Sequence, residues 1–352
     1  MEQKSSLDTI NKYRSAVMGF AALWILFFHM WQPLFSKDAS GALFYVENVV
    51  KRLGFEGVDI FFLLSGMGMT YAIGKHSLGG FYFRRFKRIA LPFVFIAAFR
   101  AIVEHWGFGG FVSVVTGFNF FTGNMYFCLW FVTAIALIYL VFPLYWRVFA
   151  QSRSKLIFTA AAIAIWYALS LLLIGVMKED MYGFTNRIPV FLTGVYLGWR
   201  AQNATKHPSR STVLLLAFVS TAAGLVLSFL CNFRSLEFIL PESNCCLPDY
   251  LTALGLVVLL SEFFAWLESL CSVTRALNCA LKFIGGISLE FYCVQEFLGG
   301  KTGNVLSGKV PDIVVNIAVL AVVTVTAWVL HRLNNMLWSY LARAKENSQE
   351  KA

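Results

Sequence analysis

Charged residues are scarce in this sequence, and their scarcity excludes an ordinary soluble domain. Asp, Glu, Lys and Arg make up 14% of the 352 residues, whereas hydrophobic residues make up 58% and the mean hydropathy is +0.67. Soluble domains contain about a quarter charged residues. No hydrophilic segment is long enough to fold by itself. The composition therefore predicts an all-α, polytopic membrane protein with no soluble domain.

Metal-binding and redox motifs are also missing. The seven cysteines form no C-x-x-C pair and show no metal-ligand spacing with histidine, so we expect no metal site. Cys231, Cys245 and Cys246 fall in one loop, where pairing of Cys231 with either neighbour stays open if the loop faces an oxidising compartment. The chain has no convincing internal repeat, which weakens the hypothesis of a transporter.

The basic residues are numerous but are not arranged for nucleic acid. Lys and Arg number 29 against 19 Asp and Glu, a net charge of +10, and they lie in short clusters between apolar runs. With alternating loops, twenty of the 29 fall on the side of the N-terminus. Such an excess is typical of cytoplasmic loops. We therefore expect a multi-pass protein of the cell (plasma or inner) membrane, with both termini in the cytoplasm and no nucleic-acid partner.

The apolar runs predict about ten transmembrane helices. The segment 108–124 is apolar but short and rich in glycine, which favours a re-entrant or interfacial segment over an eleventh span. We expect a cytoplasmic segment at 1–14, a membrane domain at 15–333 and a cytoplasmic tail at 334–352. The predicted spans are 15–34, 57–74, 89–106, 126–146, 156–177, 187–200, 212–231, 249–268, 280–299 and 312–333.

The stretch from Arg14 to Trp31 carries one imidazole deep in an apolar run. It reads RSAVMGFAALWILFFHMW, and no charge occurs between Ser15 and Phe28. At about 1.5 Å per residue it is long enough to enter a bilayer and nearly cross it. Ionisable groups in such segments are energetically costly and often functional. His29 is therefore either a functional imidazole or a histidine hydrogen-bonded to a neighbouring helix at the membrane interface.

Five further blocks follow in a characteristic order. They are GFEGVDIFFLLSGMGMTYAI (Gly54–Ile73), FYFRRFKRIALPFVF (Phe81–Phe95), LWFVTAIALIYLVFPLY (Leu129–Tyr145), RIPVFLTGVYLG (Arg187–Gly198) and IGGISLEFYCVQE (Ile284–Glu296). With a histidine late in the first span, the chain resembles the acyltransferase 3 family from about Tyr13 to Phe297. These are integral-membrane enzymes that O-acylate cell-surface carbohydrates and related acceptors. The resemblance implies ten or so helices, cytoplasmic acyl-CoA as donor and delivery to an acceptor at the outer face.

The chemistry of acyl transfer agrees with a role for His29. Transfer from a thioester to a hydroxyl requires a base, positive charge for the CoA phosphates and stabilisation of the oxyanion. The near-neutral pKa of an imidazole suits a general base. The other histidines fall at loops or span ends, and they are His76, His105, His207 and His331. With the resemblance, we predict that His29 is the catalytic base.

The family usually has an arginine eleven residues before this histidine, and here that position is Met18. Arg14 lies one turn earlier, about 22 Å from His29 along the helix axis, so it cannot touch the imidazole within this helix. Two roles for Arg14 stay open. It supplies positive charge for CoA at the cytoplasmic end, or it is a flanking cation that obeys the charge asymmetry of the loops.

Asp59 and Glu56 open the second span near the predicted outer face, at about the depth of His29. A carboxylate there can orient the imidazole or bind a sugar hydroxyl. The alternative is an acid favoured by the helix macrodipole. We predict a catalytic role for Asp59 and an acceptor-binding role for Glu56. Ser65 and Gly66 interrupt the apolar run of this span, and close packing against another helix is enough to explain these small residues.

The densest basic cluster, Arg84, Arg85, Lys87 and Arg88, precedes Pro92. It is either a membrane anchor that also attracts anionic lipid, or a binding site for the CoA phosphates, which suit the planar fork of arginine. We predict that Arg84, Arg85 and Arg88 bind the donor, with Arg85 and Arg88 favoured by the resemblance.

Three further residues are predicted to contact substrate. Trp130 begins the fourth span in a WF pair that the family shares, although interfacial aromatic belts explain it equally well. Arg187 precedes the sixth span on the outer side and can meet an anionic acceptor, and Glu290 is an intramembrane carboxylate that needs a partner. Many family members end the last block with a histidine where this chain has Gln295, so a second histidine at that position is absent.

We predict a membrane O-acyltransferase, for groups other than amino-acyl groups. It moves an acyl group, foremost acetyl, from acyl-CoA to a hydroxyl of an extracytoplasmic carbohydrate or lipid-linked glycan. We expect acyl-CoA as co-substrate, no permanently bound cofactor, and the lipid bilayer and the sugar acceptor as partners; a homodimer stays open. The alternative is a non-catalytic membrane domain that binds or exports a small molecule. Acetyl transfer that is abolished in His29→Ala would distinguish the two.

Overall fold

The computed structural model describes residues 6–35, 37–75, 77–122, 129–177, 182–205, 208–234 and 243–349. The structure is 90% helical, and these ranges contain no strand. Helices satisfy every backbone hydrogen bond within one segment, which lipid demands. The predicted all-α class is therefore confirmed.

Among the described residues, six helical segments are long and apolar enough to cross a membrane, or seven if the interrupted pair Ser272–Gly286 and Ser288–Leu306 counts as one span. This count is below the ten or so predicted, although each predicted span overlaps a helix. α4 (Leu78–Val103) does not qualify as a span because it contains the basic cluster and Arg100. α10 (Ile188–Asn203) does not qualify because it has only 16 residues. α8 (Lys155–Met177) is apolar along its length, but only its part Lys155–Ser170 enters this count, as a shorter apolar helix.

The chain forms two compact units, each described by itself. The first unit comprises Met1–Ile25, Leu53–Leu78 and Val141–Gly286. The second unit comprises Leu26–Arg52, Gly79–Leu140 and Ile287–Ala352. The boundary falls within α1 (Ser6–Met30), so most of that helix belongs to the first unit and its last turn belongs to the second.

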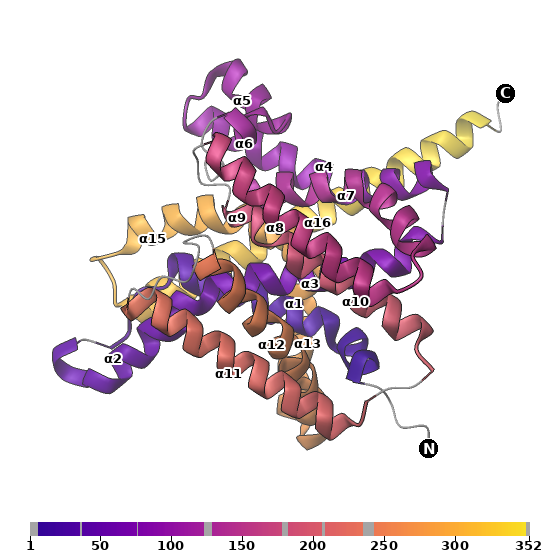
Figure 1. Ribbon diagram of the computed structural model, residues 1–352. Helices are drawn as coiled ribbons and strands as arrows, with labels where there is room; N and C mark the ends of the chain where they lie inside the picture. Colours follow the sequence, from indigo (N-terminus) through magenta and orange to yellow (C-terminus); the bar gives the residue numbers. More distant parts are fainter. Residues whose placement is uncertain are drawn as a thin grey trace. The chain divides into compact units, whose positions relative to one another are not determined.

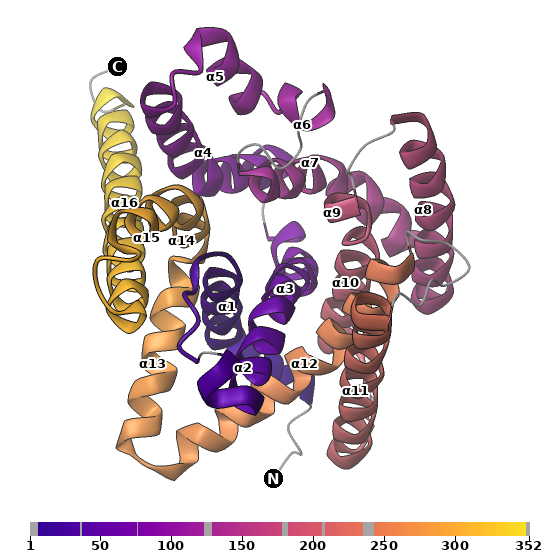
Figure 2. The ribbon, with the colours of Figure 1, turned by 90° about the vertical axis from the view of Figure 1, so that its left-hand side faces the viewer.

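The helices of the first unit approach one another through glycines. α1 lies beside α3 (Glu56–Ile73), as Figure 2 shows, and α11 (Arg210–Arg234) runs beside α12 (Ser243–Leu270), as Figure 1 shows. α1 also meets α13 (Ser272–Gly286), where a Cβ added to Gly19 or Gly285 would clash with the backbone of the other helix. Small residues permit the close van der Waals packing on which helix association in a bilayer depends.

α3 and α10 are joined in the same way. A Cβ on Gly66 or Gly194 would clash with the backbone of the other helix, and one on Gly198 would lie 2.7 Å from the carbonyl oxygen of Met67. Gly194 and Gly198 form a G-x-x-x-G pair on α10. The packing role predicted for Gly66 is therefore confirmed. The pair matters for function because α3 and the start of α10 carry several of the predicted site residues.

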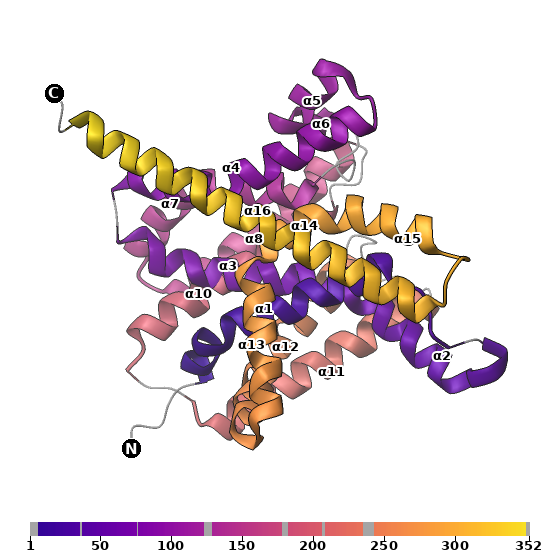
Figure 3. The ribbon, with the colours of Figure 1, turned by 180° about the vertical axis from the view of Figure 1, so that it is seen from behind.

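The second unit contains the end of α1, α4 and the C-terminal helices. In Figure 3, α16 (Asp312–Gln349) is one continuous yellow helix that ends at the C-terminus, with α14 (Ser288–Val294) and α15 (Gly300–Leu306) beside it. A π-helical turn, η3 (Gln295–Gly299), separates α14 from α15. The remaining elements of the chain are α2 (Lys37–Arg52), η1 (Leu53–Phe55), α5 (Gly107–Val115), α6 (Phe118–Thr122), α7 (Trp130–Gln151) and α9 (Tyr182–Thr185).

Several predicted boundaries differ from the structure. α1 begins at Ser6 rather than at residue 15, and α16 continues to Gln349 rather than ending at residue 333. Good helix formers such as Leu, Ala, Arg, Lys and Glu extend α16 after the apolar run ends. α2 occupies a predicted loop between the first two spans. The segment 108–124 forms the short helices α5 and α6, neither of which is long enough to span.

Candidate functional site

The first unit contains buried acidic side chains grouped around one arginine. Glu56 and Asp59 lie in the first turn of α3, Asp249 lies near the start of α12, and Arg187 caps the start of α10. We call these four residues the acid cluster. Their exposed fractions are 0% for Glu56, 1% for Asp59, 7% for Asp249 and 9% for Arg187. Three helix starts therefore present ionisable groups to the interior of one unit.

Arg187 is the cation of the acid cluster. Its Nη2 lies 3.2 Å from Oδ2 of Asp59, and its Nη1 donates a hydrogen bond of 2.8 Å to the carbonyl oxygen of Gly183. The Glu56 carboxyl interacts electrostatically with Asp249, Asp59 and Arg187. One guanidinium cannot balance three buried carboxylates, and an isolated buried charge is costly. The cluster therefore has to hold at least one proton among its acids.

This arrangement changes the surroundings expected for two predicted residues. Arg187 was expected to meet an acceptor from the outer side, but it is buried and paired with Asp59. Asp59 was expected to face His29. Its cation is Arg187, and His29 belongs to the other unit. The pairing of Asp59 with His29 therefore stays a prediction.

His29 lies in the last turn of α1, and its side chain is exposed. Its ring meets Phe28 edge-on at 4.8 Å between centroids. The chain directly after it is held by Glu47 of α2, which accepts hydrogen bonds from Nε1 of Trp31 at 2.6 Å and from the backbone N–H of Leu34 at 2.9 Å. The imidazole thus sits next to an anchored chain segment, which would hold a general base in position.

Two further contacts anchor the segment after His29. The Asn316 side chain of α16 bonds both backbone groups of Gln32: it accepts from the N–H at 2.8 Å and donates to the carbonyl oxygen at 2.9 Å. Nζ of Lys51 donates to the carbonyl oxygen of Trp31 at 2.7 Å. The second unit therefore fixes the end of α1 from α2 and from α16.

A second cluster of ionisable groups lies in the second unit. Oε1 of Glu290, on α14, lies 2.8 Å from Nδ1 of His331, and Oε2 lies 3.8 Å from an Nη of Arg88. Nε2 of His331 lies 2.9 Å from the Asn335 amide nitrogen. We call these four residues the Glu290 cluster. The Glu290 side chain is fully buried, whereas that of His331 is 23% exposed and that of Arg88 is 42% exposed.

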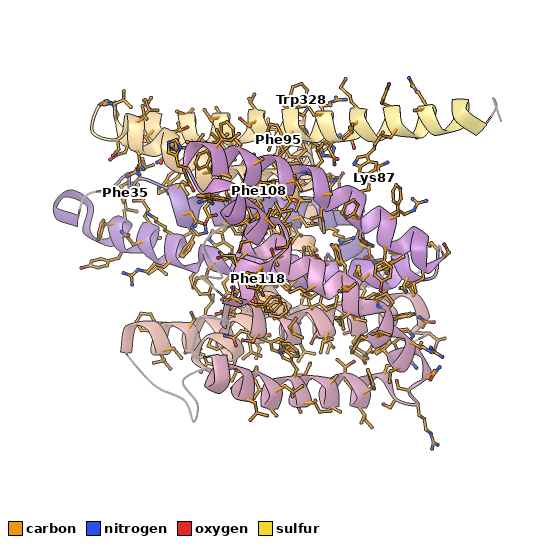
Figure 4. The ribbon with its side chains drawn as sticks, turned by 90° about the horizontal axis from the view of Figure 1, so that it is seen from above. Phe35, Lys87, Phe95, Phe108, Phe118 and Trp328 are labelled. Carbon is orange, nitrogen blue, oxygen red and sulfur yellow. The ribbon has the colours of Figure 1, made fainter. Side chains whose placement is uncertain are left out.

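The other members of the basic cluster contact aromatic rings or solvent. Arg84 is exposed. Arg85 lies over the rings of Phe81 and Tyr139, at 5.5 and 5.2 Å from their centroids. Lys87 lies alongside α16 (Figure 4), with its ammonium 5.7 Å from the ring centroid of Trp338. Cation–π contacts of this kind hold the side chains in place and leave their charge available to an anion.

Arg14 and Trp130 occupy separate places in the fold. Arg14 packs on α3, where its guanidinium lies so near to Gly68 that a Cβ there would clash with it. Trp130 is half-buried at the start of α7 and meets Phe131 edge-on at 6.3 Å. The roles predicted for both residues stay predictions.

Sequence reasoning missed Asp249, His331, Asn335 and Glu47. Asp249 opens a predicted span as Asp59 does, so the same pattern of an acid at the start of a span would have found it. His331 was expected at a loop or span end, and α16 continues for eighteen residues beyond it, to Gln349. Asn335 lies one turn after His331 but beyond the predicted end of the span, and Glu47 lies in α2, a helix that was not predicted.

The described ranges contain no group of three or more His, Cys, Asp or Glu side chains that could hold a metal ion. Cys231 is a free cysteine. His76 and His207, which were expected at loops or span ends, lie outside the described residues, as do the side chains of Cys245 and Cys246.

Comparison with known proteins adds one finding. Residues 16–332 match the family model described as Acyltransferase domain. No curated protein and no solved structure matches the chain. The match covers most of the helical part of the chain, including His29, the acid cluster and all of the Glu290 cluster except Asn335, and it confirms the resemblance seen in the sequence blocks. The chain therefore belongs to the acyltransferase 3 family of membrane acyltransferases.

Proposed function

We propose that the protein is an O-acyltransferase that moves an acyl group, foremost acetyl, from acyl-CoA to a hydroxyl of a carbohydrate or lipid-linked glycan. The observation that carries this proposal is His29, an exposed imidazole beside an anchored helix end within the matched acyltransferase domain. We place the termini and the donor in the cytoplasm and the acceptor at the outer face, in keeping with the excess of basic residues on the side of the termini.

In the proposed reaction, the acceptor hydroxyl oxygen attacks the carbonyl carbon of the thioester while His29 accepts the hydroxyl proton. The new C–O bond forms and the C–S bond breaks. The proton held by His29 then passes to the departing thiolate, which leaves as CoA thiol. The step is balanced without a metal or a redox partner.

The donor phosphates are assigned to the basic cluster. Arg85 and Arg88 present guanidinium forks suited to phosphate, and Arg84 is exposed beside them. Arg88 keeps 42% of its side chain exposed despite its ion pair with Glu290. Arg14, on α1, is a further donor-binding candidate.

The acceptor is assigned to residues near the starts of the helices. Asp59, held by Arg187, would orient the catalytic imidazole or a sugar hydroxyl. Glu56 offers a second carboxyl, and Trp130 offers an aromatic face to a sugar ring. Arg187 would then act on the substrate through Asp59, and Glu290 would act through Arg88 and His331.

The test is transfer by the full chain, purified and reconstituted in lipid nanodiscs. Release of CoA thiol from acetyl-CoA is followed with and without glycan acceptors, and acetylated product is detected by mass spectrometry. His29→Gln keeps much of the size and some hydrogen bonding but removes the base, so turnover should fall roughly 100-fold or more.

The matched control is His105→Asn. His105 is an exposed residue with a φ of 56°, a left-handed conformation that asparagine tolerates, so this variant should keep wild-type turnover. Near wild-type transfer by a well-folded His29→Gln protein would exclude His29 as the base. A wild-type protein that binds acceptor but never releases thiol would favour the non-catalytic alternative.

A further inference from the structure

Glu290 contacts two different basic side chains, one on each carboxylate oxygen. His331 approaches Oε1 at 2.8 Å, within hydrogen-bond distance, and Arg88 approaches Oε2 at 3.8 Å, which is an ion pair but not a hydrogen bond. Oε2 is buried and accepts no hydrogen bond from the described part of the chain. A buried carboxylate needs its charge compensated. A change in how one of these side chains contacts Glu290 therefore alters the interaction of Glu290 with the other.

The elements that carry this cluster bring further basic residues. Arg88 of α4 pairs with Glu290, Lys87 of α4 lies over the ring of Trp338, and Arg332 follows His331 on α16. The nearby acid Glu296 of η3 has its own partner, with Oε2 3.7 Å from an Nη of Arg100. Arg88 and His331 therefore share one buried carboxylate, and a weaker Arg88 contact leaves more of the compensation of Glu290 to His331.

Asn335 suits either protonation state of the imidazole. Its amide nitrogen lies 2.9 Å from Nε2 of His331 and can donate to the neutral ring. Rotation of the amide would present its oxygen to a protonated ring instead, since the two ends of an amide differ only in being donor or acceptor. The ring therefore keeps a partner at both nitrogens whether or not it carries the extra proton.

We propose that donor binding is linked to proton uptake at His331. When a phosphate of acyl-CoA engages Arg88, the guanidinium compensates Glu290 less. The imidazole then takes a proton from solvent and becomes the principal cation of the buried carboxylate. Glu290, His331 and Asn335 are thus positioning residues for Arg88 in the donor site. This inference rests on the proposed function, because it requires a phosphate-bearing donor at Arg88.

The test is calorimetric titration of the full chain in nanodiscs with CoA near pH 7. Titration in two buffers of very different ionisation enthalpy gives the number of protons exchanged on binding. Engagement of a phosphate monoester by arginine tends by itself to release protons from the phosphate. The informative quantity is therefore the difference between wild type and variants.

We expect more proton uptake by wild type than by His331→Gln, while His331→Gln still binds CoA. Glu290→Gln should also lose this uptake, and Arg88→Gln should bind CoA more weakly. Glu296→Gln is the matched control, because it neutralises a carboxylate of the same segment that pairs with another arginine of α4 at 3.7 Å. It should keep wild-type uptake.

Equal proton exchange by wild type and His331→Gln, with CoA bound by both, would overturn the inference and leave the proposed donor site intact. Loss of uptake in Glu296→Gln equal to that in Glu290→Gln would also overturn it. If wild type binds no CoA, the proposed donor site and this inference both fail.

Discussion

The acid cluster and the Glu290 cluster both place carboxylates inside a membrane protein, but they balance the charge differently. The acid cluster has three acids for one arginine, and none of its members is more than 9% exposed. The Glu290 cluster has one acid for an arginine and a histidine, and both basic side chains are partly exposed. The acid cluster is therefore short of positive charge and closed, whereas the Glu290 cluster has more basic side chains than acids and is open.

This difference separates two uses of a buried charge. In the acid cluster the guanidinium is paired with Asp59, so its main effect is to lower the free-energy cost of burying three neighbouring acids. In the Glu290 cluster the long Arg88 contact and the exposed side chain leave the guanidinium able to engage a ligand. A pair of an acid and an arginine thus stabilises the fold in the first unit, whereas such a pair suits ligand binding in the second unit.

The largest effect should follow loss of the single cation of the acid cluster. Arg187→Met leaves buried carboxylates without compensation and should lower the free energy of unfolding by about 3–5 kcal/mol. The measurement is the unfolding midpoint of the detergent-solubilised protein. Adding Asp59→Asn to this variant removes the stranded charge and should restore part of the loss. An unchanged midpoint in Arg187→Met, or no recovery in the double variant, would refute a charge-balancing role.

A smaller loss should come from separating the helices that carry Asp59 and Arg187. Gly194→Val places side-chain atoms against the backbone of α3 at Leu63 and should cost about 1–3 kcal/mol through overpacking. Gly74→Ala is the control. No atom lies within 4 Å of a Cβ added there, and its φ of −85° suits alanine. Equal stability of the two variants would show that the glycine contact does not hold α3 and α10 together.

The smallest effect on stability should come from the arginine of the Glu290 cluster. Arg88→Met should lower the free energy of unfolding by roughly 0–1 kcal/mol, because this ion pair is long and partly solvated. Its effect should instead appear as a raised KM for acyl-CoA, measured beside the unfolding midpoint. If Arg88→Met lost as much stability as Arg187→Met and kept its KM for acyl-CoA, the two arginines would have the same structural role, and the distinction between the clusters would be wrong.

Much of the fold was readable because hydropathy is a local property. Each predicted span overlaps a helix, and Gly66 was recognised as a packing position. The blocks around Asp59, the basic cluster and Glu290 identified the family, which the domain match confirms. The number of spans, about ten, stays a prediction, because apolar length in the sequence says nothing about where a helix begins, bends or takes charged residues into its body.

The sequence by itself therefore determined the all-α membrane class and the family, and His29 as the base stays a prediction. Only the tertiary structure decided that Asp59 pairs with Arg187 and that Glu290 pairs with His331, since these partners lie on helices far apart along the chain. The physical reason is that a side chain's partner depends on which helix faces are buried together. In the first unit, glycine contacts such as those between α3 and α10 set that choice by allowing two backbones to touch.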